Sequence, residues 1–524
     1  MKRQKGTNHY LIGRQNGSMT LFLALILTLV FSLFFSLLEA ARVQGISQIA
    51  RRSLLLELES AFGEYQVDLW ENYRLLFLDG SNQAGELDLA LLENRRMQEA
   101  SLEQKGVGFY QMALKNLEVT KYSLASDHGG AAFEKQACLA IQKQLAAGAA
   151  EALKQKIAEG KEMAQEGESL EGQWDSAKNA MMEAKDYKEE AQGGNPTVSG
   201  TSKEQETGNM SLSEENRPGS AGNTEKELPK NPVESVDMLK KSAILAVVVE
   251  NPSEISGKEI PIRDTLKRRV KCEGSMGTPK CKNLDKIWFL QYIDHFFACK
   301  TGRGKEGSEE HALDYELEYC VAGKGSDHKN LEKTVKELLL IREAGNFTTI
   351  MQDAKKCALA LEIATAAVGF TGIPPLIQAV QIGILLAWSY IESILDVRCL
   401  LSGGSVPLVK KVTQWKSDVS LGEQMIEEKA EKTESQKEGL NYREYLQILL
   451  LLVREETLVY RAMDIVERNI GLKDPVFRMD HQLHGVQMEG LYSAKPLFLA
   501  FMPYGTVKDG DYHFYESYSY SYLK

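Results

Sequence analysis

The sequence predicts an α+β protein in which an N-terminal transmembrane helix continues into a helical stalk, followed by a mixed domain with long helices and an antiparallel sheet. Three observations predict this class. Residues 19–38 form an uncharged apolar run, apolar residues recur at helical spacing over much of the chain, and the C-terminal end alternates as a strand does. With 524 residues, of which 43% are hydrophobic, the chain is long enough for two or three domains.

Met19 and Leu38 bound the predicted membrane anchor. Fourteen of its twenty residues are Leu, Ile, Val or Phe. A helix of this length spans about 30 Å, which matches the hydrocarbon core of a bilayer. A cleaved signal peptide has a shorter apolar region and small residues before the cut, where this chain has Leu38 and Glu39. We therefore expect an uncleaved anchor.

The charges around the anchor predict its orientation. Four basic residues and no acidic residue precede it, at positions 2, 3, 5 and 14, whereas three arginines follow at positions 42, 51 and 52. This bias favours residues 1–18 as a cytoplasmic leader, with the bulk of the chain extracytoplasmic. Membrane lipid is the expected partner, and the net charge of −11 argues against a nucleic-acid partner.

Glu39 and Arg42 stand where the anchor leaves the apolar core. One interpretation is that they are interfacial residues that end the span. The other is that they are assembly contacts, with Glu39 paired to a basic group on a neighbouring anchor.

Residues 39–190 are predicted to form a helical stalk and hairpin region. The stretch from residue 90 to 190 is rich in good helix formers, and a four-residue apolar repeat predicts a helical hairpin or short coiled coil. The repeat comprises Ala137, Ile141, Leu145, Ala149, Leu153 and Ile157. Residues 191–235 are predicted to be a disordered linker, because residues 191–232 contain no aromatic residue and are mostly small, polar or charged. The linker either separates two ordered regions or is a long loop within one.

Residues 236–524 are predicted to form an α+β extracytoplasmic domain. Residues 243–252 are a β-branched run and residues 313–321 alternate apolar and polar, so both are predicted strands. Ser326 or Asp327 is positioned to cap a following helix. The Tyr-rich tail at residues 512–522 is a predicted closing strand.

A second uncharged stretch, residues 363–391, raises the alternative of a second membrane span. Pro374 can begin a helix that runs to about Arg398. One narrow polar stripe on this helix favours a nearly buried helix of a soluble domain. The stripe comprises Gln378, Gln381, Ser389, Glu392 and Asp396.

No catalytic, cofactor-binding or metal site is predicted. His481 and His484 could share one face of a turn, but two histidines without further ligands at a suitable spacing are a weak metal signal. The letters GRGKEG at residues 302–307 match a dinucleotide fingerprint without its strand and helix context. Seven cysteines cannot all pair within one chain, although a disulfide between Cys272 and Cys281 would close a short loop.

Several stretches support a resemblance to known families. The anchor, NGSMTLFLALILTLVFSLFFSLLEAAR, resembles the N-terminal anchor of TadE/TadG-like proteins of Tad (Flp) pilus systems. The chain from the anchor to beyond Val453 resembles an uncharacterised domain-of-unknown-function family (DUF5702-like) of Gram-positive bacteria. The matching stretches include LWENYRLLFLDG, ILAVVVENPSEISGKEI, LDYELEYCVAGKGSDHKNLEKTVKELLLIREAGN and YREYLQILLLLV.

The resemblance implies a single-pass structural or interaction protein, a minor pilin-like subunit or an assembly partner, with no known enzymatic activity. Its expected partners are other pilus-assembly proteins or its own copies, with no cofactor and no small-molecule substrate. Processing at Gly17 would leave Phe22 at the fifth position, where major pilins have Glu, so the chain departs from a true prepilin. The alternatives are a two-span component of a secretion machine and an envelope metal-dependent hydrolase that uses His481 and His484.

Overall fold

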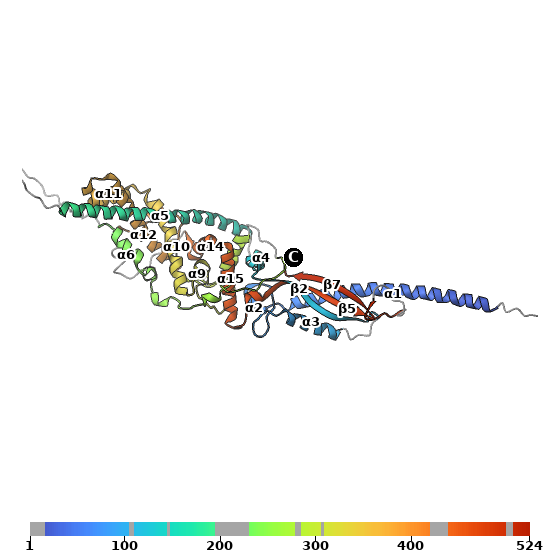
Figure 1. The fold of residues 1–524 in the computed structure, drawn as a ribbon. Coiled ribbons are helices and arrows are strands. Elements are labelled where there is room, and N and C mark those ends of the chain that lie inside the picture. The colour runs from blue at the N-terminus through green and yellow to red at the C-terminus, as the bar shows by residue number, and fades with distance from the viewer. Residues whose placement is uncertain are drawn as a thin grey trace, which may run out of the picture. The chain divides into compact units, whose positions relative to one another are not determined.

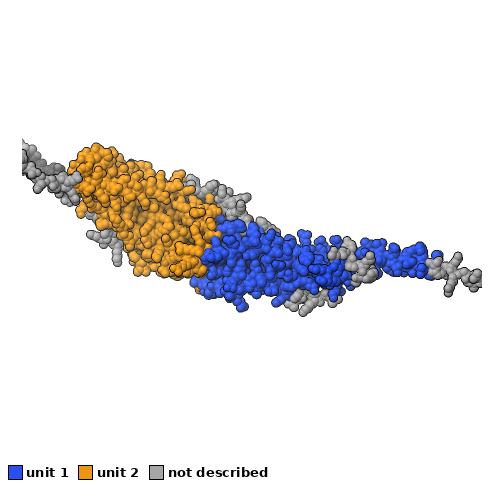
Figure 2. Space-filling model, in the orientation of Figure 1, with its two compact units in different colours: residues 1–137, 269–282, 469–524 blue, residues 138–268, 283–468 orange. Residues whose placement is uncertain are grey.

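A computed structural model describes residues 16–103, 109–143, 147–193, 230–277, 285–304, 306, 309–419, 439–498 and 507–523. The chain forms two compact units, and neither is one continuous stretch of sequence (Figure 2). Unit 1 consists of residues 1–137, 269–282 and 469–524, and unit 2 of residues 138–268 and 283–468. The predicted α+β class is confirmed, with a long apolar N-terminal helix and an antiparallel sheet.

Helix α1 (Asn16–Gly63) is the longest element of unit 1. Its first half is exposed at nearly every position from Met19 to Leu37. Among the described residues, the stretch Met19–Gly63 is the one helix long and apolar enough to cross a membrane. From Glu39 onward, α1 buries residues every three or four positions, which is the spacing of a single helical face. The predicted continuation of the anchor into a longer helix is therefore confirmed.

The second half of α1 packs against an antiparallel sheet, as the adjacent ribbons in Figure 1 show. The central strand β5 (Gln482–Ala494) pairs with β2 (Met112–Leu124) along one edge and with β7 (Asp511–Ser521) along the other. Met112 lies opposite Ala494, so the loop before β2 and the loop after β5 meet at the same end of the sheet. The predicted closing strand at residues 512–522 is confirmed as β7.

The core of unit 1 lies between α1 and this sheet. Leu54 and Leu58 of α1 and Val486 and Met488 of β5 are all fully buried. The even-numbered aromatic residues of β7 pack against the same core, and the Phe62 ring lies 4.9 Å from the Tyr520 ring, measured between centroids. The remaining elements of unit 1 are α2 (Val67–Tyr73), β1 (Leu78–Asp79), α3 (Leu89–Glu103), most of α4 (Asp127–Gln142), the 3₁₀ turn η5 (Met479–His481) and β6 (Val507–Lys508).

Unit 2 is built around α12 (Pro374–Leu401), which packs against α10 (Asp327–Ile350), α5 (Ala147–Gly193) and α11 (Ala354–Val368). The predicted helix from Pro374 is confirmed. Residues 383–394 of α12 are all buried, so this helix is a core helix of unit 2. The other elements are α6 (Val233–Lys241), α7 (Ile244–Val248), α8 (Asp285–Phe296), α9 (Glu316–Ala322), β3 (Ser405–Val406), β4 (Leu440–Asn441), α14 (Tyr442–Leu452), most of α15 (Glu455–Gly471) and the 3₁₀ turns η1 (Pro252–Glu254), η2 (Ile262–Asp264), η3 (Gly369–Thr371) and η4 (Val412–Gln414).

Two predicted strands are wrong. Residues 313–321 contain most of helix α9 instead of a strand. All seven residues of that helix are buried, including its two Glu residues. The alternation of apolar and polar letters therefore does not separate an inner from an outer face. Residues 243–252 contain α7, a short helix with Ile244, Leu245 and Val248 buried, so tertiary packing overrides the β-branched preference.

The predicted helical stalk and hairpin region, residues 39–190, also contains strands, because residues 78–79 form β1 and residues 112–124 form β2. Of the apolar repeat, Ala137 and Ile141 lie on α4 and are fully buried, whereas Leu145 is outside the described residues. Most of the predicted linker, residues 194–229, also lies outside the described residues. The helices on either side of it, α5 and α6, both belong to unit 2.

Candidate functional site

A buried ion pair on α1 lies between the apolar first half of this helix and the sheet of unit 1. Arg42 Nη1 donates to Glu39 Oε1 at 3.0 Å, one helical turn away, and both side chains are about 1% exposed. Arg42 also donates to three backbone carbonyl oxygens. Nε bonds Phe109 at 3.0 Å, Nη1 bonds Lys495 at 2.9 Å and Nη2 bonds Tyr110 at 2.9 Å.

The Glu39 carboxylate accepts hydrogen bonds from the loop after β5. It accepts the backbone N–H of Leu497 at 3.2 Å and of Phe498 at 3.1 Å. Together, Glu39 and Arg42 satisfy five backbone groups of the loop before β2 and the loop after β5. We call the ion pair and these two loop segments, residues 109–110 and 495–498, the junction.

Aromatic side chains surround the junction on the side of the anchor. The Phe498 ring stacks on Phe35 of α1 with centroids 5.7 Å apart, and Phe109 lies 6.1 Å from Phe498. A Cβ atom at Gly45 would lie 2.6 Å from the Tyr110 ring, so the glycine permits the close approach of this loop to the helix. The junction therefore combines a polar interior with an aromatic exterior.

The structure brings Glu39 and Arg42 together, as their spacing allows, and it places Met19 and Leu38 at the two ends of the apolar half of α1. Their bonds within the chain agree with the first interpretation, in which they end the span. An ion pair between Glu39 and a neighbouring anchor stays a prediction.

A second group of buried charges fills the polar stripe of α12 in unit 2. Arg342 of α10 donates to Asp396 Oδ2 from Nε at 3.0 Å and from Nη2 at 2.8 Å. Lys410 forms ion pairs with both Glu392 and Asp396. All four side chains are at most 3% exposed, so these charges form a closed electrostatic network within the core of unit 2.

This network bears on the alternative of a second membrane span. The charged half of the stripe, Glu392 and Asp396, is paired inside unit 2, while Gln381 donates to the Cys357 carbonyl at 3.0 Å and Gln378 is exposed. The α12 helix is thus surrounded by other helices of unit 2. Among the residues described, no second helix is long and apolar enough to be a candidate membrane span.

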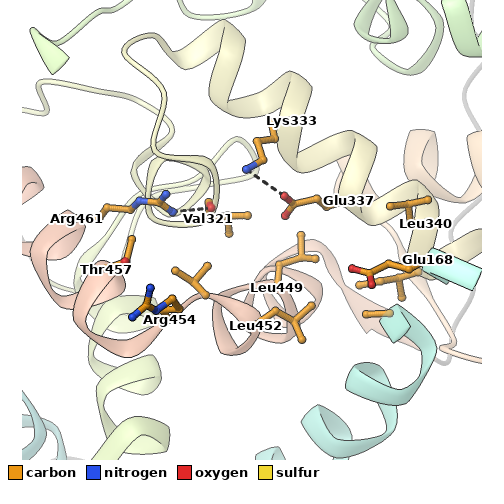
Figure 3. Close-up of a pocket in the computed structure, with 13 residues that line it drawn as sticks. Glu168, Val321, Lys333, Glu337, Leu340, Leu449, Leu452, Arg454, Thr457 and Arg461 are labelled. Atoms are coloured by element: carbon orange, nitrogen blue, oxygen red, sulfur yellow. Dashed lines mark hydrogen bonds and ion pairs between the residues drawn. The ribbon is translucent and has the colours of Figure 1, made fainter. Parts of the chain in front are cut away.

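One pocket of unit 2 lies between α5, α10 and α14 and the residues that follow α14 (Figure 3). It has a volume of about 360 Å³ and an apolar floor that includes Leu340, Leu449 and Leu452. At its rim, Lys333 and Glu337 form an ion pair at 3.5 Å. Burial raises the pKa of the Glu337 carboxyl.

A cation that lines this pocket, Arg461, is already hydrogen-bonded within the protein. Arg461 donates to the carbonyl oxygens of Cys320 at 2.8 Å and Val321 at 2.7 Å, so its guanidinium holds the end of α9. The described lining residues include no Ser, Cys or His, and the polar ones among them include Thr457, Glu168 and Glu337. The pocket can accept an apolar group.

The histidines of the hydrolase alternative are positioned as core residues of unit 1. His484 is 2% exposed, its ring lies 6.3 Å from Phe77, and burial lowers its pKa to about 4. Burial also lowers the pKa of His481. Within the described ranges, no group of three or more His, Cys, Asp or Glu residues is arranged to hold a metal ion.

The structure forms no disulfide among the six cysteines that it describes. Cys281, the proposed partner of Cys272, lies outside the described residues, as does part of the glycine motif at residues 302–307.

Sequence reasoning missed the cations that complete the α12 network. Arg342 had a usable signal, because it follows four apolar residues, 338–341, in a predicted helix, and a cation in such a run requires a buried anion. Lys410 lies in a loop without periodicity, so its distant carboxylate partners have no counterpart in local sequence. The same holds for the loops at the junction, which reach Arg42 from positions 67 and 453 residues away.

Comparisons with known proteins add one match. Residues 222–494 match a family described as a family of unknown function (DUF5702). No curated protein and no solved structure matches the chain.

Proposed function

Because the chain belongs to DUF5702, a family of unknown function, no activity comes with the family, and we propose a role from the geometry of unit 1. The protein is a single-pass, membrane-anchored structural subunit or assembly partner of a Tad/Flp-like surface appendage. Its N-terminus is cytoplasmic and the rest of the chain extracytoplasmic. The proposal includes no catalytic activity and no cofactor.

The observation that carries this proposal is the division of α1 into two halves. From Met19 to Leu37 its apolar side chains are exposed all around the helix, whereas from Glu39 onward one face is buried against the sheet. A helix that is apolar all around requires lipid or other apolar helices as its surroundings. The first half can therefore lie in a bilayer and can also pack against the same half of another subunit.

The resemblance of the anchor to TadE/TadG-like proteins selects the pilus system among membrane-anchored proteins. The pocket of unit 2 is compatible with a role in binding an apolar group, since Leu340, Leu449 and Leu452 line it. Partners are other pilus-assembly proteins or further copies of this chain.

The test uses a photoreactive benzophenone amino acid in the full-length protein in its own cells. The probe replaces Phe22 or Leu29, which are 61% and 68% exposed on α1, and Val270, which is 98% exposed in unit 1, serves as the control. We expect crosslinks from Phe22 and Leu29 to another copy or to another anchored protein. Protease added to wall-less cells should digest the chain beyond Glu39.

Protection of residues 439–498 from the protease would contradict the single-pass topology. Crosslinks to lipid alone at both anchor positions would contradict an assembly role while leaving the anchor in place.

A further inference from the structure

The junction exposes apolar side chains directly beside the anchor. Phe109 is 48% exposed, Tyr110 38% and Leu497 43%, on two loops that meet at the same end of the sheet. Exposed aromatic and aliphatic side chains on adjacent loop segments are unfavourable in water. Tyr and other amphipathic aromatic side chains are favoured where a membrane meets water.

The level of these loops relative to the anchor is set by direct contacts. Phe498 stacks on Phe35, and Phe35 lies three residues before Leu38, the last residue of the apolar run. At 1.5 Å per residue, Phe35 is about 4.5 Å inside the end of that run. The described loop segments, residues 109–110 and 495–498, therefore reach the boundary of the hydrocarbon region whenever Met19–Leu38 spans it.

The ion pair at the junction satisfies backbone groups that would otherwise keep these loops away from the hydrocarbon region. Backbone N–H and C=O groups that leave water need hydrogen-bond partners, and loops near the hydrocarbon region usually lack them. Here Arg42 supplies donors to three carbonyl oxygens of the two loops, and Glu39 accepts two N–H groups of the loop after β5. Loop segments exposed to water would need no such buried partners, because water would satisfy their backbone.

We propose that the junction is a membrane-interface site, in which Phe109, Tyr110, Leu497 and Phe498 insert into the headgroup–acyl boundary of the outer leaflet. Glu39 and Arg42 make this insertion possible by satisfying the loop backbones. Two loops and one helix then contact the bilayer, so unit 1 has a fixed depth and a fixed rotation on the membrane surface. This inference rests on the proposed membrane anchor, and it adds a second lipid-binding element to it.

The experiment uses full-length protein in vesicles of phosphatidylcholine and phosphatidylglycerol, with the benzophenone amino acid at one position at a time. Phe109 and Leu497 test one loop each. Leu29 reports whether the anchor is inserted, and Val270 is an exposed control in the same unit. After irradiation, mass spectrometry of the labelled peptide identifies lipid adducts.

We expect lipid adducts at Phe109, Leu497 and Leu29 and none at Val270. Adducts at Leu29 without adducts at either loop would overturn the membrane-interface site and leave the anchor standing. Crosslinks from both loops to a second copy of the chain, in place of lipid, would also overturn it. A lack of lipid adducts at all four positions would overturn both proposals.

Discussion

Glu318 is a carboxylate in the interior of unit 2 with an incomplete set of partners. Its Oε1 accepts the Lys300 N–H at 2.9 Å and the Tyr442 hydroxyl at 2.8 Å, whereas Oε2 is buried without a partner among the described residues. Burial raises the pKa of this carboxyl to about 7. The protonated acid is therefore the stable form in the folded protein over a pH range in which the unfolded chain ionises.

The sign of the pH dependence follows from this shift. Because the pKa of Glu318 is higher in the folded state, its contribution to stability is fully present below the unfolded pKa of about 4.5. That contribution is lost as the pH rises to about 7. We compare the free energy of unfolding of Glu318→Gln with that of the wild type. We predict that this difference shifts in favour of the variant by on the order of 3 kcal/mol between pH 4.5 and pH 8. Urea denaturation at both pH values measures this difference.

The control for this prediction is Glu309→Gln, which removes an exposed carboxylate. His484 titrates with the opposite sign, since its lowered pKa reduces stability as the pH falls from about 6.5 to 4. This contribution is present in all three proteins and cancels in the differences. Equal pH dependence of the wild type and Glu318→Gln would show that Glu318 is ionised in the fold.

At the scale of elements, Arg42 joins one helix to two loops. We predict that Arg42→Met destabilises unit 1 by about 3–5 kcal/mol, because it leaves the Glu39 charge buried and three carbonyl oxygens without donors. The measurement is urea denaturation of the full chain in detergent micelles. Arg52→Met, on the exposed face of the same helix, should change stability by no more than about 0.5 kcal/mol.

The double variant Glu39→Gln/Arg42→Met removes the uncompensated charge and should recover part of the loss. If Arg42→Met and Arg52→Met have equal stability, the ion pair does not hold the loops to the helix.

Elements with a single dominant local signal could be predicted from the sequence. The uncharged run at Met19–Leu38, the Pro start of α12 and the alternating tail of β7 each specify their structure locally. Helix α9 could not be predicted, because its Glu316 and Glu318 are buried by contacts with residues outside the helix. Strand β2 pairs with a strand more than 350 residues away, and only that partner makes it a strand.

The junction was half predictable for the same reason. Glu39 and Arg42 could be singled out because charged residues at the end of an apolar helix require partners. The partners themselves, the backbone groups of residues 109–110 and 495–498, carry no sequence signal, since any residue has an N–H and a C=O.

At the scale of the whole molecule, the family match and the folded units have different boundaries. Residues 222–494 leave out α5, which covers α12 and α10 with buried side chains such as Leu170 and Trp174. Losing these two side chains alone removes about 3–6 kcal/mol of stabilisation from apolar burial. The free energy of unfolding of a whole domain is only about 5–15 kcal/mol. The matched region also contains β5 without β2 or β7.

We predict that a fragment of residues 222–494 does not unfold cooperatively, whereas residues 39–524 do. Circular dichroism during thermal unfolding distinguishes the two outcomes. Residues 39–524 retain Glu39, Arg42 and every strand of the sheet, so they are the matched control. A sharp thermal transition of the shorter fragment would mean that the matched region folds without α5.

The pairing of β2 with β5 also determines the order of events when the chain is made. Helix α1 precedes β2 in the sequence, yet two strands that cover it, β5 and β7, follow β2 by more than 350 residues. At about 5–20 residues per second, the interval between the end of β2 and the start of β5 is roughly 20–70 s. During this time the buried face of α1 has no partner strand from the C-terminal end. A chain that stops before β5 therefore leaves apolar side chains of α1, such as Leu54 and Leu58, without the strands that bury them. The packing of this helix is completed only after a long delay, because its covering strands come from the other end of unit 1 in sequence.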